Sequence, residues 1–248
     1  PEGDLLCLVL DDEGSGFQFL YMVVSGEQGK RGIHRENLGT ATLPYLSECP
    51  QAYEPVDLIV LGNIDPQQVG ARQRELLYSY VRNGGVVAVC TGQFARNYRG
   101  TWMEDLLGTK IGADEPVDEG ALAKTVFSPE EQTGARAGRQ LAVATLEPQA
   151  PEVERIGTER TLATRRPLGA GCVYALAVDA DSLALQDTPG YRKLGREIST
   201  ARRGVGALNV DAVASYVTET LPRISGIVVH SKASVILYLV LYFLVAVV

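Results

Sequence analysis

Apolar residues gather in short continuous runs, separated by charged and glycine-rich segments. Three runs, at residues 5–10, 57–61 and 86–90, predict buried strands, because a parallel strand covered on both faces is apolar throughout. Between the second and third runs the apolar residues recur at helical spacing, at Leu76–Leu77 and Tyr80–Val81. Strand, helix and strand in succession predict a parallel βαβ unit with a right-handed crossover.

Turn residues set the limits of this predicted helix. Asp65 is suited to an N-cap, with Pro66 at the first helical position. Gly84 and Gly85 follow the last periodic residue, where glycine commonly ends a helix. Residues 26–39 are rich in glycine and charge, which favours a surface loop.

The later part of the chain changes character. Residues 113–168 predict a β-rich excursion from the sheet, with antiparallel strands at 141–146 and 161–165. A tight turn at 169–171 leads into a last strand at 172–178, and a helix is expected at 191–197. The fold class predicted is α/β, a three-layer sandwich with a mainly parallel sheet of flavodoxin-like or amidotransferase-like type.

An uncharged apolar run of 16 residues extends from Ala233 to Val248. We expect a transmembrane helix over 227–248, with Lys232 at the interface; a buried core helix or strand is the alternative. The predicted organisation is an α/β domain at 1–205, a helical linker at 206–226 and the membrane segment.

Composition narrows the function. With 23 basic and 30 acidic residues the net charge is −7, which argues against a nucleic-acid partner. The four cysteines show no CxxC spacing, so zinc and thioredoxin-type chemistry are disfavoured and no cofactor is expected. Two histidines, His34 and His230, leave little material for acid–base chemistry.

Polar residues follow the predicted strands at their carboxyl ends, where parallel α/β sheets bind ligands. The candidate binding residues are Asp11, Asp12, Asn63, Asp65, Thr91, Gly92, Gln93, Asp179 and Asp181. Their carboxylates would suit magnesium or calcium. Solvation and helix capping are the interpretation that we prefer, and we predict no metal site.

Cys90 is the candidate nucleophile. It ends a predicted strand between small residues, Ala88 and Gly92, as a strand-to-helix elbow requires. A thiol nucleophile usually needs a base, and no histidine follows a predicted strand. The alternative interpretation is a small apolar residue that closes a buried strand.

Two stretches resemble the class I glutamine amidotransferase-like superfamily, in its membrane-anchored bacterial branch. They read VDLIVLGNIDPQQVGARQRELLYSYVRNGGVVAVCTGQ and RPLGAGCVYALAVDADSLALQDTPGYRKL. The resemblance covers roughly residues 5–200 and places the nucleophile at Cys90, followed by Gly92 and Gln93. Ala88 replaces the first elbow glycine, and Asp179-Ala180-Asp181 stands where the family has His-Pro-Glu. It therefore implies a degenerate relative without the catalytic base.

We accordingly expect a non-catalytic, membrane-tethered domain that binds a protein partner or ligand at the bacterial cell envelope. The resemblance implies an extracytoplasmic domain and companions of the von Willebrand factor A or MoxR type. A cysteine-dependent amidase or amidotransferase-like hydrolase using Cys90 is one alternative. A small-ligand sensor at the strand carboxyl ends is another.

Overall fold

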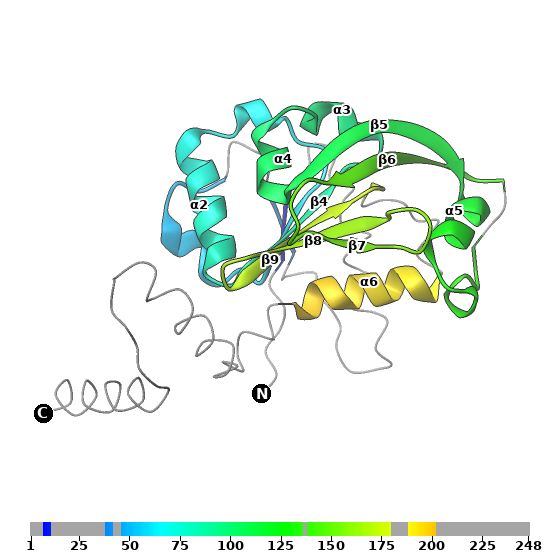
Figure 1. Ribbon diagram of the computed structural model, residues 1–248. Helices are drawn as coiled ribbons and strands as arrows, with labels where there is room; N and C mark the ends of the chain where they lie inside the picture. Colours follow the sequence, from blue (N-terminus) through cyan, green and yellow to red (C-terminus); the bar gives the residue numbers. More distant parts are fainter. Residues whose placement is uncertain (1–6, 11–37, 42–45, 136–137, 180–187, 202–248) are drawn as a thin grey trace, which may run out of the picture. The chain divides into compact units, whose positions relative to one another are not determined.

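The computed structural model describes residues 7–10, 38–41, 46–135, 138–179 and 188–201 (Figure 1). All of them belong to the first of two units into which the chain divides, Pro1–Arg202. The second unit, Arg203–Val248, lies outside the described residues, as do the predicted linker, the predicted membrane segment and the candidates Asp11, Asp12 and Asp181.

A seven-stranded sheet forms the centre of the first unit, in the order β2-β1-β3-β4-β9-β8-β7. Its strands are β1 (Cys7–Leu10), β2 (Leu38–Ala41), β3 (Leu58–Leu61), β4 (Val86–Cys90), β7 (Glu154–Ile156), β8 (Ala163–Leu168) and β9 (Gly171–Leu176). The neighbours from β2 to β9 pair in parallel, whereas β9–β8 and β8–β7 are antiparallel. The prediction of a mixed α/β fold with a mainly parallel sheet is confirmed.

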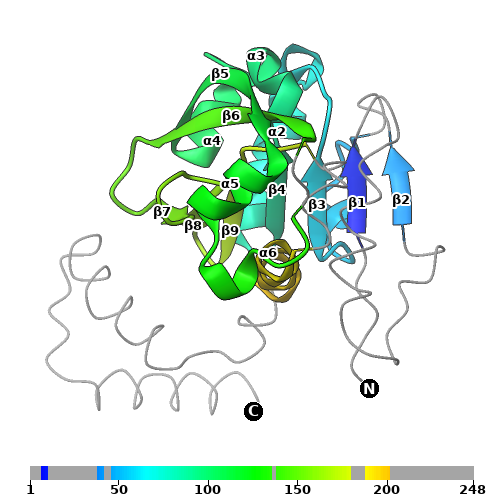
Figure 2. The same cartoon turned by 90° about the vertical axis from the view of Figure 1, so that its right-hand side faces the viewer.

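Helices lie on both sides of this sheet. The helical segments are η3 (Pro50–Tyr53), η4 (Pro66–Gln68), α2 (Ala71–Arg82), η5 (Gly92–Phe94), α3 (Ala95–Tyr98), α4 (Trp102–Leu107), α5 (Glu119–Val126), η6 (Pro129–Glu131) and α6 (Pro189–Thr200). Figures 1 and 2 show α2 and α6 on opposite sides of β4 and β9. The buried side chains of α2 are the four that the sequence periodicity indicated, Leu76, Leu77, Tyr80 and Val81.

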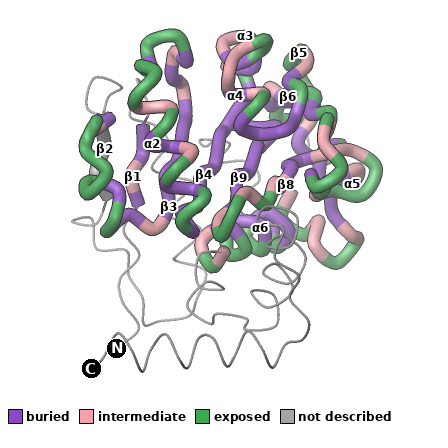
Figure 3. The backbone as a smooth tube through the Cα atoms, turned by 60° about the vertical axis from the view of Figure 1, so that its left-hand side comes forward, coloured by how far each residue is buried: buried purple, intermediate pink, exposed green. Residues whose placement is uncertain are grey.

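The core follows from this layering. All five residues of β4 are buried, and five of the six in β9 are buried with them. Figure 3 shows these two central strands buried along their length. Tyr191, Leu194 and Ile198 close the core from the buried face of α6.

A second, two-stranded antiparallel sheet joins β5 (Thr109–Asp118) to β6 (Gln140–Pro148). This confirms the predicted strand at 141–146, and a hydrogen bond of 2.7 Å from the Ala144 N–H to the Ala177 carbonyl ties β6 to the end of β9. The assignment of 161–165 to the excursion is wrong. β8 belongs to the main sheet instead, because it forms a hairpin with β9 through the turn at Gly169.

Two local predictions also need correction. Asp65 and Pro66 begin the short helix η4 and not α2, because Val69 and Gly70 are extended and separate the two helices. The predicted loop at 26–39 overlaps β2, which takes Leu38 and Gly39 into the parallel sheet. No helix among the described residues is long and apolar enough to cross a membrane.

The β8–β9 turn packs tightly against the end of α2. The Ala170 N–H donates to the Arg82 carbonyl at 2.9 Å, and the Cys172 N–H donates to the Gly85 carbonyl at 3.3 Å. A Cβ atom at Gly171 would overlap the backbone carbonyls of Gly85 and Val81. Backbone atoms cannot yield as a flexible side chain does, so this position requires glycine.

Gly171→Ala should therefore lower the free energy of unfolding by about 1–3 kcal/mol, the usual cost of overpacking. Chemical denaturation of the full chain measures this. Gly70→Ser is the matched control, because Gly70 has an ordinary φ of −63° and its built Cβ comes no closer than 3.4 Å to any neighbour. Equal stability of the two variants would contradict the close packing of turn and helix.

Candidate functional site

The strand pairing of β4 and β9 continues past the end of β4. Cys90 pairs with Leu176 in the sheet register. The next residue, Thr91, donates its backbone N–H to the Leu176 carbonyl at 3.0 Å, and its hydroxyl donates to the same oxygen at 2.7 Å. Thr91 is fully buried. Both donors of Thr91 are thus used to extend the sheet.

Gly92 and Gln93 turn directly under the carboxylate of Asp179, which follows β9. The Gln93 N–H donates to Asp179 Oδ1 at 3.1 Å. Gly92 has a φ of +38°, and a Cβ atom there would overlap both the carboxylate and the backbone nitrogen of Asp179. Only glycine allows the carboxylate to lie this close to the turn, so three predicted site residues, Gly92, Gln93 and Asp179, meet at one point.

Cys90 does not have the geometry of a nucleophile elbow. Its side chain lies in the core, 1% exposed, and its backbone belongs to a regular strand. An elbow holds its nucleophile in a strained turn. Every described residue with a positive φ is glycine, so the backbone of Cys90 is not strained in this way. Both histidines of the chain lie outside the described residues.

The carboxyl end of β3 carries two further predicted residues. Asn63 Oδ1 accepts a hydrogen bond of 3.4 Å from the Asn97 side chain of α3. Asp65 caps η4, accepting from the Gln67 N–H at 3.0 Å and the Gln68 side chain at 3.3 Å. Asp65 is therefore a helix cap, as the capping interpretation proposed.

Within the described residues no three His, Cys, Asp or Glu side chains are grouped so that they could hold a metal ion. The Asp65 carboxylate accepts the hydrogen bond that caps η4, and the Asp179 carboxylate accepts a hydrogen bond from the turn after β4.

The other three thiols differ sharply in their surroundings. Cys7 and Cys172 are buried on strands, and burial raises the pKa of Cys7 to about 12 and also raises that of Cys172. Cys49 is exposed, and its thiol donates to Gln51 Oε1 at 2.9 Å.

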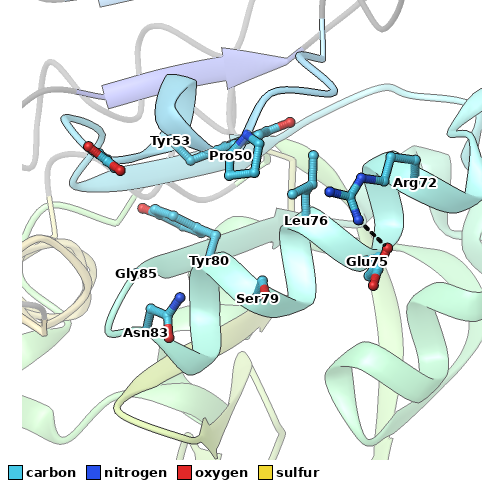
Figure 4. Close-up of a pocket in the computed structure, with 10 residues that line it drawn as sticks. Pro50, Tyr53, Arg72, Glu75, Leu76, Ser79, Tyr80, Asn83 and Gly85 are labelled. Atoms are coloured by element: carbon cyan, nitrogen blue, oxygen red, sulfur yellow. Dashed lines mark hydrogen bonds and ion pairs between the residues drawn. The ribbon is translucent and has the colours of Figure 1, made fainter.

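A groove at the opposite end of the strands, near their amino ends, was not predicted. It has a volume of about 360 Å³ and lies between η3 and α2, next to Gly85 at the start of β4 (Figure 4). Tyr53, Leu76, Tyr80 and Gly85 form its buried floor; Pro50, Glu54, Arg72, Glu75, Ser79 and Asn83 form its exposed rim. From the sequence only one wall of the groove could be predicted, because α2 is periodic but residues 46–56 show no regular pattern.

Comparison with known proteins gives similarity in fold. No protein-family profile and no curated protein sequence matches the chain. A cytoplasmic protein of Salmonella typhimurium LT2 superposes with a TM-score of 0.53 at 14% identity, covering 78% of this chain and 97% of that one. A second cytoplasmic protein of that organism gives the same TM-score and identity over 80% and 98%.

An exo-β-1,4-mannosidase from an Opitutaceae bacterium gives a TM-score of 0.46 at 14% identity. The match covers 84% of this chain but only 36% of the mannosidase, so the chain spans about a third of that enzyme. At 14% identity the two Salmonella proteins show similarity in fold and no activity.

Asp179→Ala should lower the free energy of unfolding by about 0.5–1 kcal/mol, since the solvent-exposed hydrogen bond from the Gln93 N–H to a charged group is lost. Asp179→Asn keeps an acceptor oxygen and should recover most of this loss. Urea unfolding of the full chain checks both. If Asp179→Ala is as stable as the wild type, the carboxylate does not brace the turn.

Proposed function

We propose that this chain is a non-catalytic, membrane-tethered α/β domain that binds a protein partner or ligand at the bacterial cell envelope. The observation that carries the proposal is the turn after β4, where the backbone amide that would bind the oxyanion in acyl-transfer chemistry is already bonded within the protein. A nucleophile elbow uses the backbone N–H of the residue after the nucleophile to bind the oxyanion. Here that N–H belongs to Thr91 and donates to Leu176.

Burial of Cys90 points the same way. A thiol that is 1% exposed has no path to a substrate, and a buried cysteine behaves as a small apolar residue. The sequence also places Asp179, with Ala180 and Asp181, where the amidotransferase-like superfamily has its histidine. The alternative of a Cys90-dependent amidase or amidotransferase-like hydrolase is therefore the less supported one.

The membrane tether rests on the sequence. The uncharged run from Ala233 to Val248 approaches the length that a bilayer requires. Together with the resemblance to the membrane-anchored amidotransferase-like branch, it supports a domain that is held at the membrane outside the cytoplasm. The same resemblance supports a three-layer sandwich for that domain. Companions of the von Willebrand factor A or MoxR type follow from the resemblance only.

Thiol labelling tests the non-catalytic proposal. With iodoacetamide at pH 7, Cys49 should react rapidly in the native full chain, whereas Cys7, Cys90 and Cys172 should react only after unfolding. Labelling sites are read by mass spectrometry of peptides. Selective native labelling of Cys90, or ammonia release from glutamine that Cys90→Ala abolishes, would overturn the proposal.

Membrane fractionation tests the tether. The full chain, expressed in bacteria, should stay in the membrane pellet after a carbonate wash. Leu241→Arg should move it toward the supernatant, because an arginine at the centre of a span costs about 2.5–3.5 kcal/mol. Leu241→Ala is the size control and should remain in the pellet. A wild-type chain found in the supernatant would refute the tether.

A further inference from the structure

Asn83 and Gly84 form the one Asn–Gly pair of the sequence, and they lie at the end of α2. The chain has five asparagines, and the other four are followed by leucine, isoleucine, tyrosine or valine. Glycine has no side chain to hinder its backbone nitrogen. This nitrogen can therefore approach the side-chain amide carbon of the preceding asparagine, which is the first step of deamidation.

The surroundings of Asn83 also differ from those of the other asparagines that the structure describes. Asn83 is exposed, and Figure 4 shows it next to Gly85 at the end of α2. Asn63 and Asn97 are half-buried, and the side-chain amide of Asn97 donates to that of Asn63 at 3.4 Å. Water and base thus reach the amide group of Asn83 directly.

The nitrogen that would attack is held in the cap of α2. The Gly84 N–H donates to the Val81 carbonyl, and the Gly85 N–H donates to the Tyr80 carbonyl, both at 2.9 Å. Gly84 has a φ of +104°, the left-handed conformation that ends many helices. The Gly84 nitrogen reaches the Asn83 side chain only after its bond to Val81 has opened.

The β8–β9 turn holds this cap closed. Its Ala170 N–H donates to the Arg82 carbonyl at 2.9 Å, and the Cys172 N–H donates to the Gly85 carbonyl at 3.3 Å. The two acceptors lie on either side of Asn83 in the sequence. The end of α2 therefore cannot open widely while the turn stays in place.

We propose that Asn83 is a site of spontaneous deamidation, and that the docking of the β8–β9 turn on α2 limits its rate. When the cap opens, the Gly84 nitrogen attacks Cγ of Asn83. The Cγ–Nδ2 bond breaks, and Nδ2 leaves as ammonia with the proton that the Gly84 nitrogen has lost. Water then opens the resulting succinimide ring, to aspartate by attack at Cγ or to isoaspartate by attack at the main-chain carbonyl.

Isoaspartate would weaken the join between α2 and the hairpin. Its main chain runs through Cβ, which adds one bond between the Arg82 and Gly85 carbonyls. The hydrogen bonds that these two carbonyls accept from the β8–β9 turn then no longer fit together. The new carboxylate also lies at the carboxyl end of α2, where the helix dipole disfavours a negative charge. This inference is independent of the proposed function, because it involves neither Cys90 nor the membrane segment.

Ageing of the full chain in detergent, at 37 °C and mildly alkaline pH, tests the site. Peptide mass spectrometry that separates aspartate from isoaspartate follows each asparagine. Asn83 should convert before the other four, and about tenfold more slowly than in guanidinium chloride, because the cap must open first. Earlier conversion of another asparagine in the native chain, no conversion at Asn83, or equal rates in the native and unfolded chains would overturn the proposal.

Two glycine variants test the limit on the rate. Gly171→Ala should speed native conversion at Asn83 about fivefold, because the added Cβ pushes the β8–β9 turn away from the cap. Gly190→Ala is the matched control, since its Cβ would overlap the Phe127 ring beside α6 and does not touch the cap. It should leave the rate at Asn83 within about twofold of the wild type. Equal acceleration by both variants would mean that the reaction follows global unfolding.

A comparison of unfolding tests the effect of isoaspartate. Asn83→Asp supplies the charge without the added main-chain bond, and Asn83→Gln keeps the amide on a longer side chain that should not convert. In urea, aged wild-type chain should unfold at a lower midpoint than Asn83→Asp, and aged Asn83→Gln should unfold as it did when fresh. If the aged wild type and Asn83→Asp share one midpoint, isoaspartate does not weaken the join.

Discussion

The pairing of β4 with β9 is the constraint on which the rest of the structure depends. Both strands are buried at the centre of the sheet, and the pairing continues through Thr91 to Leu176 after β4 has ended. Because β9 is also joined to β8 by a tight hairpin, this pairing fixes the antiparallel edge of the sheet. The hairpin turn in turn packs against the end of α2.

This constraint has a consequence for function. In parallel α/β folds the turn after a central strand is where ligands usually meet backbone amides. Here the amides of Thr91 and Gln93 donate to Leu176 and Asp179, and a glycine lets the carboxylate approach. The turn is thus stabilised by the protein's own oxygens. The groove with a charged rim lies at the opposite end of the strands, near the start of β4.

The sequence predicted the elements in which apolar residues follow a regular pattern. Apolar runs located β3 and β4, and the spacing of Leu76, Leu77, Tyr80 and Val81 located α2, because burial on both faces or on one helical stripe leaves a regular pattern. The pattern could not place β8, since sheet membership depends on a distant partner. It also missed α4 and α5, which are short helices with little periodic sequence.

For the candidate site, strand-end position brought Gly92, Gln93 and Asp179 together in the prediction, and the structure places them in contact. What the sequence could not give was the direction of the hydrogen bonds, which decides whether the amides face a ligand or the protein. The groove was missed because one of its walls comes from an irregular segment. Its tyrosines look like ordinary core residues in the sequence.

Hydrogen exchange at the Thr91 amide tests the central claim most directly. If this N–H is bonded to Leu176 inside the core, it should exchange as slowly as the interior amides of β4, through global unfolding alone. The rate is measured by native-state exchange on the full chain, with and without glutamine. Fast exchange typical of an exposed turn, or slowing caused by glutamine, would contradict the account.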